Sequence, residues 1–180
     1  MKALVLFGSP RRGNTYKLTE SFKKGLEERN IQVEFIDVTK LNISHCKSCD
    51  FCLKNKGCIF KDDMEQIYTK IYESDIIVLA SPVYFGTVTS YLKVLIDRCQ
   101  PLYNRRFVLN IEDKVKRKGV LIFTAGRKNK KMVDAMELVA KYFLFSCNAD
   151  LNEVIYCLNT DENDIEGAIL ETAYERALRV

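Results

Sequence analysis

The sequence contains a single histidine, His45, among 180 residues. This scarcity excludes any metal or catalytic site that needs two histidines, and we expect His45 to be an exposed loop residue. No apolar run approaches the roughly 20 residues that span a bilayer, and the first residues lack the cleavage pattern of a secretion signal. These absences predict a cytoplasmic protein without a membrane partner.

Internal repeats, low-complexity tracts and flexible linkers are also missing, so we expect one domain over residues 1–180. The net charge of +4 is mild. It lacks the concentrated basic footprint of a nucleic-acid binder, and we expect no nucleic-acid partner.

Strand-like and helix-like segments alternate along the chain. Continuous apolar runs, typical of strands buried on both faces, occur at Ala3–Phe7, Ile76–Ala80 and Val120–Phe123. Edge-like strands are predicted at Ile31–Phe35 and Val154–Leu158. Helical spacing of apolar residues occurs in Thr15–Arg29, Asp63–Ser74, Val88–Arg98, Met132–Phe145 and Ile165–Ala177, with Asp63 and Gln66 in capping-box spacing. The pattern predicts an α/β fold with a five-stranded parallel sheet in the order 2-1-3-4-5.

In such a sheet, ligands bind at the carboxyl ends of the strands, where the strand order reverses. The first loop at that edge, Gly8–Thr15, opens a helix whose N-terminus favours a phosphate. Hydrogen-bond donors and charge are supplied there by Ser9, Asn14, Thr15 and Arg11 or Arg12. The loop lacks the Gly-Lys-Ser/Thr ending of a P-loop and the glycine spacing of a dinucleotide fold. A polar turn with a helix cap is the alternative interpretation.

A second loop, Ser81–Thr87, follows the third strand and contains two adjacent aromatic residues. Tyr84 and Phe85 can supply a flat apolar wall, and Gly86 allows close backbone approach to a ring. The alternative is that the two aromatic side chains simply pack into the core.

Together, the stretches GSPRRGNT and SPVYFGTVTSYLKVLIDR resemble the NADPH-dependent FMN reductase family. The resemblance implies a flavodoxin-like three-layer sandwich that binds FMN. It implies that the FMN phosphate is held by Ser9, Arg11, Asn14 and Thr15, with Arg12 adding charge. It also implies that the isoalloxazine ring is bordered by Pro82, Val83, Tyr84, Phe85 and Gly86. The loop Thr124–Asn129, with Ala125 and Gly126, would close the other side, although lysines stand where relatives often carry glycine.

Seven cysteines are the unusual feature of the composition. An odd number without a secretion signal argues against a disulfide framework. Three scattered cysteines are interpreted as small buried hydrophobes: Cys99, Cys147 and Cys157. The other four form a Cys46-x2-Cys49-x2-Cys52-x5-Cys58 motif, whose short spacers let successive thiolates converge on an iron–sulfur cluster. A four-thiolate zinc site and unligated thiols remain alternatives.

The cysteine motif, followed by Asp62-Asp63-Met64, narrows the resemblance to the iron–sulfur flavoprotein subgroup. That resemblance implies a [4Fe–4S] cluster and a homodimer or homotetramer, in which the cluster of one subunit faces the FMN of a neighbour. The predicted function is FMN-dependent oxidoreduction in which flavin and cluster exchange electrons. Ferredoxin or NAD(P)H would be the donor and a small molecule the acceptor. No side chain stands out as a general acid or base.

Two other functions remain open at this point. One is an NAD(P)H-dependent FMN or quinone reductase without a cluster, and the other is a non-catalytic electron carrier or zinc-stabilised binding module. A basic stretch is interpreted as solvated surface, with docking of an acidic electron carrier or of the 2′-phosphate of NADPH as the functional alternative. It comprises Arg105, Arg106, Lys114, Lys116, Arg117, Lys118, Arg127, Lys128, Lys130 and Lys131.

Overall fold

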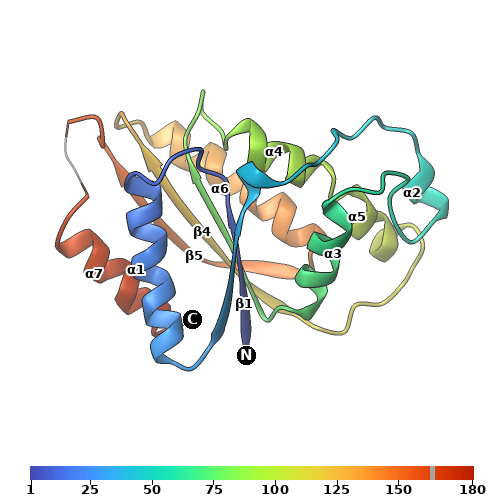
Figure 1. The fold of residues 1–180 in the computed structure, drawn as a ribbon, viewed down its shortest axis with the longest axis horizontal. Helices are drawn as coiled ribbons and strands as arrows, with labels where there is room; N and C mark the ends of the chain where they lie inside the picture. Colours follow the sequence, from blue (N-terminus) through green and yellow to red (C-terminus); the bar gives the residue numbers. More distant parts are fainter. Residues whose placement is uncertain (163–164) are drawn as a thin grey trace.

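The computed structural model describes residues 1–162 and 165–180. Its centre is a five-stranded sheet with the order β2-β1-β3-β4-β5, and every pair of neighbouring strands is parallel (Figure 1). The strands are β1 (Lys2–Phe7), β2 (Gln32–Asp37), β3 (Ile76–Pro82), β4 (Arg117–Ala125) and β5 (Ala149–Leu158). The predicted fold class and strand order are confirmed.

Helices cover both faces of this sheet (Figure 1). On one face lie α1 (Asn14–Glu28) and α7 (Ala168–Ala177), and on the other α3 (Met64–Glu73), α4 (Ser90–Asp97), α5 (Gln100–Phe107) and α6 (Lys130–Ser146). The short elements are η1 (Val38–Lys40) and α2 (Phe51–Lys54). Within the described residues, no helix is long and apolar enough to cross a membrane.

The apolar run of β1 is continuous because its residues alternate between two separate cores. Leu4 and Leu6 pack with helices α3, α4 and α6. Ala3, Val5 and Phe7 pack with α1 and α7 on the opposite face. Burial on both sides therefore requires an apolar residue at every position from Ala3 to Phe7.

Three local predictions need correction. Helix α5 is missing from the predicted elements, and its Pro101 occupies the first helical turn, where proline is tolerated. The expected capping box does not form, since Asp63 makes no capping bond to α3. Its Oδ2 instead accepts a hydrogen bond from the Asn42 N–H at 2.7 Å. The first turn of α3 is bonded by Asp62, whose Oδ1 accepts from the Met64 N–H at 3.1 Å.

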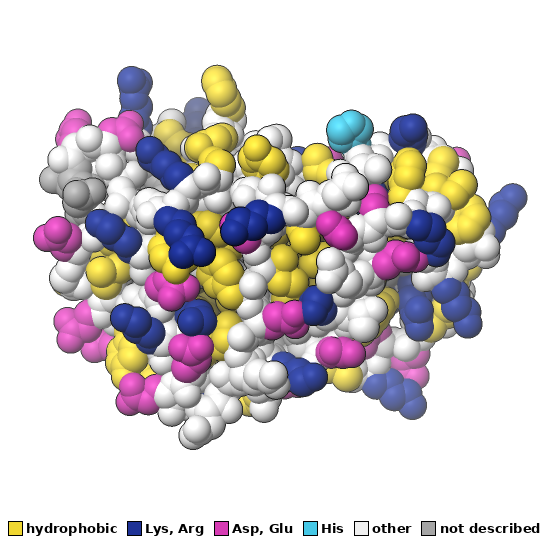
Figure 2. Space-filling view, in the orientation of Figure 1, with side chains coloured by type: hydrophobic (Ala, Val, Ile, Leu, Met, Phe, Trp, Pro, Cys, Tyr) yellow, Lys and Arg dark blue, Asp and Glu magenta, His cyan; other side chains and the backbone are white. Residues whose placement is uncertain are grey.

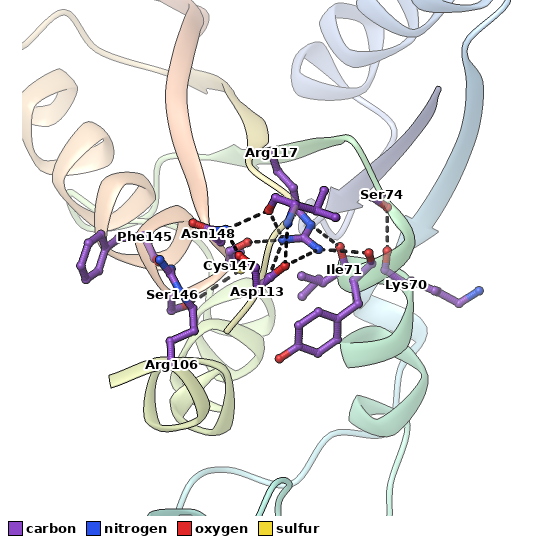
Figure 3. A network of polar contacts seen from close by, with 12 residues as sticks. Lys70, Ile71, Ser74, Arg106, Asp113, Arg117, Phe145, Ser146, Cys147 and Asn148 are labelled. Carbon is purple, nitrogen blue, oxygen red and sulfur yellow. Dashed lines mark hydrogen bonds and ion pairs between the residues drawn. The ribbon is translucent and has the colours of Figure 1, made fainter. Parts of the chain in front are cut away.

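Arg117 is the third correction, because it is buried and not part of a solvated basic stretch. Its guanidinium forms an ion pair with Asp113 at 2.7 Å and donates to four main-chain carbonyls (Figure 3). Those carbonyls belong to Ile71, Tyr72, Val115 and Cys147. Arg117 therefore joins the ends of α3 and α6 to the start of β4.

The predictions for His45, Cys99 and Cys147 are confirmed, whereas Cys157, which was predicted to be buried, is not fully so. Cys99 and Cys147 are buried and Cys157 is partly buried, while His45 is exposed. Burial raises the pKa of the Cys147 thiol to about 12, so this thiol is protonated at neutral pH.

Candidate functional site

The carboxyl end of β1 is fixed against the start of α4. The Gly8 N–H continues the sheet by donating to the Ala80 carbonyl at 2.8 Å, and the Thr89 hydroxyl donates to the Gly8 carbonyl at 2.6 Å. A Cβ on Gly8 would lie only 2.7 Å from the Cβ of Leu92. Glycine at this position therefore allows the loop after β1 to lie directly on α4.

The loop after β1 leads into α1, whose first turn is bonded to the end of β4. The Ser9 hydroxyl donates to the Arg11 carbonyl at 2.7 Å, which fixes a tight turn. The hydroxyls of Thr15 and Thr124 are 2.7 Å apart and share a buried hydrogen bond. This bond holds the N-terminus of α1, with its free N–H groups and partial positive charge, at the sheet edge.

The loop after β3 ends in a tight turn that presents an aromatic side chain. Tyr84 and Thr87 exchange two main-chain hydrogen bonds, of 2.8 and 3.1 Å, across residues Phe85 and Gly86. Those two central residues have φ values of +49° and +81°, as a type I′ turn requires. Glycine adopts this conformation readily, but a bulky residue rarely does. Phe85 is also fully exposed, at 109% of its reference area, so it is a candidate contact residue.

A cavity of 190 Å³ lies between these loops. Eight predicted cofactor residues line it: Ser9, Arg11, Asn14, Thr15, Pro82, Val83, Tyr84 and Gly126. Four others do not: Arg12, Phe85, Gly86 and Ala125. The Arg12 guanidinium lies 4.9 Å from the Tyr16 ring centroid, and Ala125 is buried in the core.

Two lining residues of this cavity, Thr160 and Asp161, were missed by the sequence reasoning. They follow β5, and only the loops after the first, third and fourth strands were expected to contribute. The N–H groups of both residues bond to the carbonyls of Ala125 and Gly126, which extends the β4–β5 pairing into the loops. A Cβ on Gly126 would lie 2.3 Å from a carboxylate oxygen of Asp161. This glycine therefore creates the space in which Asp161 sits beside the cavity.

The second and larger cavity, of 460 Å³, is lined by all four cysteines of the motif: Cys46, Cys49, Cys52 and Cys58. Cys46 and Cys49 are exposed, and Cys52 and Cys58 are partly buried. The segment that carries them includes α2 and projects at one end of the long axis of the molecule (Figure 1). Apolar side chains gather at the same end (Figure 2), where Phe51, Leu53 and Ile59 are exposed.

Hydrogen bonds close the base of this cysteine segment. The Ser44 N–H donates to Asp62 at 3.0 Å, and Asn42 and Asp63 are joined by two bonds. We call this set of contacts the neck. Arg98, at the end of α4, joins the two sides of the neck. Its guanidinium donates to the Ser44 carbonyl at 2.7 Å and to the Asp62 carboxylate at 2.6 Å. Partial burial acts to raise the pKa of the Asp62 carboxyl, but these hydrogen bonds hold it below its usual range.

Arg98 also carries a buried donor without a partner. Its side chain is 1% exposed, and Nε is a buried side-chain polar atom for which the described residues provide no hydrogen-bond acceptor. The residue lies on the wall of the cysteine-lined cavity. The guanidinium charge is paired with Asp62, but the unsatisfied Nε–H fits a group with hydrogen-bond acceptors, and a cluster held by four thiolates is such a group.

A single metal ion fits this arrangement less well. Zinc bound by four cysteines needs all four sulfurs about 2.3 Å from one point. In the part of the chain that the structure describes, no three His, Cys, Asp or Glu side chains converge in that way. A cubane places each thiolate on a different iron, so its sulfurs lie farther apart around a larger cavity.

Comparisons with known proteins place this geometry in context. Residues 1–150 match the NADPH-dependent FMN reductase family. An iron-sulfur flavoprotein of Methanocaldococcus jannaschii is 34% identical over 149 residues, covering 81% of this chain and 72% of that protein. An iron-sulfur flavoprotein of Archaeoglobus fulgidus is 43% identical over 95 residues, covering 53% of this chain and 49% of that protein. The chain therefore spans about half the length of some curated relatives that it matches.

Solved structures with the same fold cover the whole chain. An NAD(P)H:quinone oxidoreductase from Methanothermobacter marburgensis has a TM-score of 0.73 at 19% identity, covering 99% of this chain and 93% of that one. The azoreductase AzrA has a TM-score of 0.76 at 17% identity and full coverage of both chains. At such low identity these likenesses show the fold alone.

Proposed function

Because the chain belongs to the iron–sulfur flavoprotein subgroup of the NADPH-dependent FMN reductase family, and is thereby an FMN-dependent oxidoreductase, we propose that it passes electrons between FMN and a [4Fe–4S] cluster. One observation carries the cluster part of the proposal: four cysteines in compact spacing line one cavity, together with the buried and partly unsatisfied Arg98. Arg98 would offer its unpaired Nε–H to an occupant there.

We propose that FMN binds in the 190 Å³ cavity, with its phosphate at the N-terminus of α1. Ser9, Asn14 and Thr15 would donate to the phosphate, and Arg11 would add positive charge. Pro82, Val83 and Tyr84 would border the ring, with Phe85 and Gly86 forming the turn beside it. The cavity volume is below the usual range for a cofactor pocket. The ring would therefore extend beyond it, toward the exposed Phe85.

Substitution of Gly126 tests the flavin site. The new Cβ of Gly126→Ala would displace the Asp161 carboxylate, which lies 2.3 Å away. We expect FMN affinity to fall about tenfold, roughly 1.4 kcal/mol, in a fluorescence titration. Lys24→Ala is the control, because Lys24 is exposed near the end of α1 and does not line the cavity. Equal affinities in the two variants would show that FMN does not bind beside Gly126.

When bound, the flavin accepts electrons singly or in pairs and the cluster transfers one at a time. The chain contributes binding, orientation and charge. Nucleophilic chemistry by Cys99 or Cys147 does not enter, since burial raises the pKa of both thiols. We propose ferredoxin or NAD(P)H as the donor, a small molecule as the acceptor and the cytoplasm as the location.

The oligomeric part of the proposal follows from where the two cavities lie. The cysteine segment projects from one end of the molecule, away from the loop between β1 and α1 (Figure 1). We propose a homodimer or homotetramer in which the cysteine segment of one subunit meets the flavin site of another. Exposed apolar residues beside the cysteines, Phe51, Leu53 and Ile59, would be covered in that contact.

Anaerobic purification followed by iron, zinc and flavin quantification tests the whole proposal. We expect about four irons and about one FMN per chain, with broad visible absorption that bleaches on reduction. Cys52→Ser and Cys58→Ser should lose the iron and keep the flavin, because the cysteine and flavin cavities are separate. Flavin without iron would indicate a plain FMN or quinone reductase, and about one zinc per chain would indicate a four-thiolate zinc site.

A further inference from the structure

We propose that Asn104 donates a hydrogen bond to the cluster-bound sulfur of Cys52 and thereby raises the reduction potential of the cluster. This inference rests on the proposed function, because it requires a cluster at the four cysteines. Asn104 would be a positioning residue that acts through the Cys52 sulfur.

The hydrogen bond is present in the folded chain. The Asn104 Nδ2 lies 3.1 Å from the Cys52 Sγ. Asn104 is 6% exposed and lines the cysteine cavity. Among the described hydrogen bonds, no side chain donates to the sulfur of Cys46, Cys49 or Cys58. Cys52 is therefore distinguished from the other three cysteines by this donor.

Helix α5 holds Asn104 in place. The Asn104 carbonyl accepts bonds from the N–H groups of Val108 and Leu109, at 2.9 and 2.8 Å, at the end of the helix. Helix α2, which carries Cys52, packs on α5. The donor is thus supplied by a helix outside the cysteine segment.

The direction of the effect follows from charge. An amide N–H donated to a thiolate stabilises negative charge on sulfur, and the reduced cluster carries one more electron than the oxidised cluster. The hydrogen bond therefore favours the reduced state. Removal of the hydrogen bond therefore makes reduction of the cluster harder. The cluster then holds less tightly the one electron that it accepts from ferredoxin or from flavin reduced by NAD(P)H.

The test is an anaerobic redox titration of the cluster, followed by electron paramagnetic resonance, in the full-length protein. Asn104→Leu removes the donor, and Asn104→Asp keeps the shape but leaves only acceptor oxygens when ionised. We expect the ratio of oxidised to reduced cluster at a given potential to rise about tenfold. This corresponds to a midpoint potential about 59 mV lower for a one-electron couple. Asn152→Asp is the matched control, because Asn152 lies on β5 outside the cysteine cavity and its Oδ1 accepts from the Gly119 N–H, a role that aspartate keeps. Its midpoint should equal that of the parent protein.

A second measurement uses the parent protein, so that it does not depend on the variants folding. With asparagine labelled with ¹⁵N in the side-chain amide, pulsed paramagnetic resonance should detect coupling between the reduced cluster and one such nitrogen. That coupling should be lost in Asn104→Leu. It should persist in Asn55→Asp, because Asn55 donates to the Phe51 carbonyl and not to a sulfur. Absence of this coupling, or midpoint potentials in the iron-loaded Asn104 variants equal to that of the parent protein, would overturn the inference. Either result would leave the proposed cluster itself unaffected. Absence of iron from the anaerobically prepared parent protein overturns the proposed cluster and this inference with it.

Discussion

Replacement of Arg117 by leucine is expected to lower the free energy of unfolding by about 3–5 kcal/mol, the largest loss among the single substitutions considered. The guanidinium is 1% exposed and serves Asp113 and four carbonyls from three segments of the chain (Figure 3). Two of these carbonyls, of Ile71 and Tyr72, lie in the last turn of α3, where a positive charge is favourable. Leucine would leave the Asp113 carboxylate without its cation and would remove a donor from each of these buried carbonyls.

Urea denaturation gives the measurement, and Lys116→Leu is the control. Lys116 is the neighbouring residue and pairs with Asp150 at 2.6 Å, but both side chains are more than half exposed. A pair of that kind contributes about 0–1 kcal/mol. Adding Asp113→Leu to Arg117→Leu should recover only part of the loss, because the four carbonyls still lack the donor that Arg117 supplied. A loss in Arg117→Leu no larger than in Lys116→Leu would contradict this role.

Replacement of Arg98 by methionine is expected to open the neck of the cysteine segment. The side chain joins Asp62 to the Ser44 carbonyl, and its loss leaves a mostly buried carboxylate without its cation. The free energy of local opening should fall by about 3–5 kcal/mol. Hydrogen exchange over residues 42–62, corrected for intrinsic rates, should then accelerate on the order of 10²-fold or more at pH 7.

The pH dependence of this effect has a definite sign. The pKa of the folded Asp62 carboxyl is lowered, so its contribution to stability is present above the unfolded value near 4. That contribution is lost as the pH falls through the lower folded pKa. The difference in corrected hydrogen-exchange rate between Arg98→Met and the parent protein should therefore become smaller below about pH 4. Lys93→Met, which removes a half-exposed pair with Asp97 on the same helix, should show neither the acceleration nor the narrowing.

The sequence predicted the sheet well because its signals are local. Continuous apolar runs mark β1 and β3, and the edge-like patterns of β2 and β5 indicate the strand order. The loops after β1 and β3 could be chosen because the fold brings the carboxyl ends of neighbouring strands together. Thr160 and Asp161 were missed because β5 lies at the edge of the sheet, and its terminal loop reaches the cavity only through bonds to Ala125 and Gly126.

Other features depend on contacts between residues far apart in the chain. Arg117 and Arg98 are buried although arginine is usually exposed, because carboxylates and carbonyls from distant segments surround them. Asp63 suggested a helix cap by its spacing from Gln66, but the side chains of Asp62 and Asp63 bond the main chain of Ser44 and Asn42. No periodicity in the sequence encodes such pairings, so they became visible only in the folded chain.

The neck has a consequence for the entropy of metal capture. Closing a flexible loop of 13 residues, from Cys46 to Cys58, requires its ends to be brought together at a cost that grows with the logarithm of its length. Here Asp62, Asp63 and Arg98 join residues 42 and 44, which precede the loop, to residues 62 and 63, which follow it. Binding of the proposed cluster would therefore need to order only the interior of the loop. Removal of that cluster would leave the two ends of the loop joined.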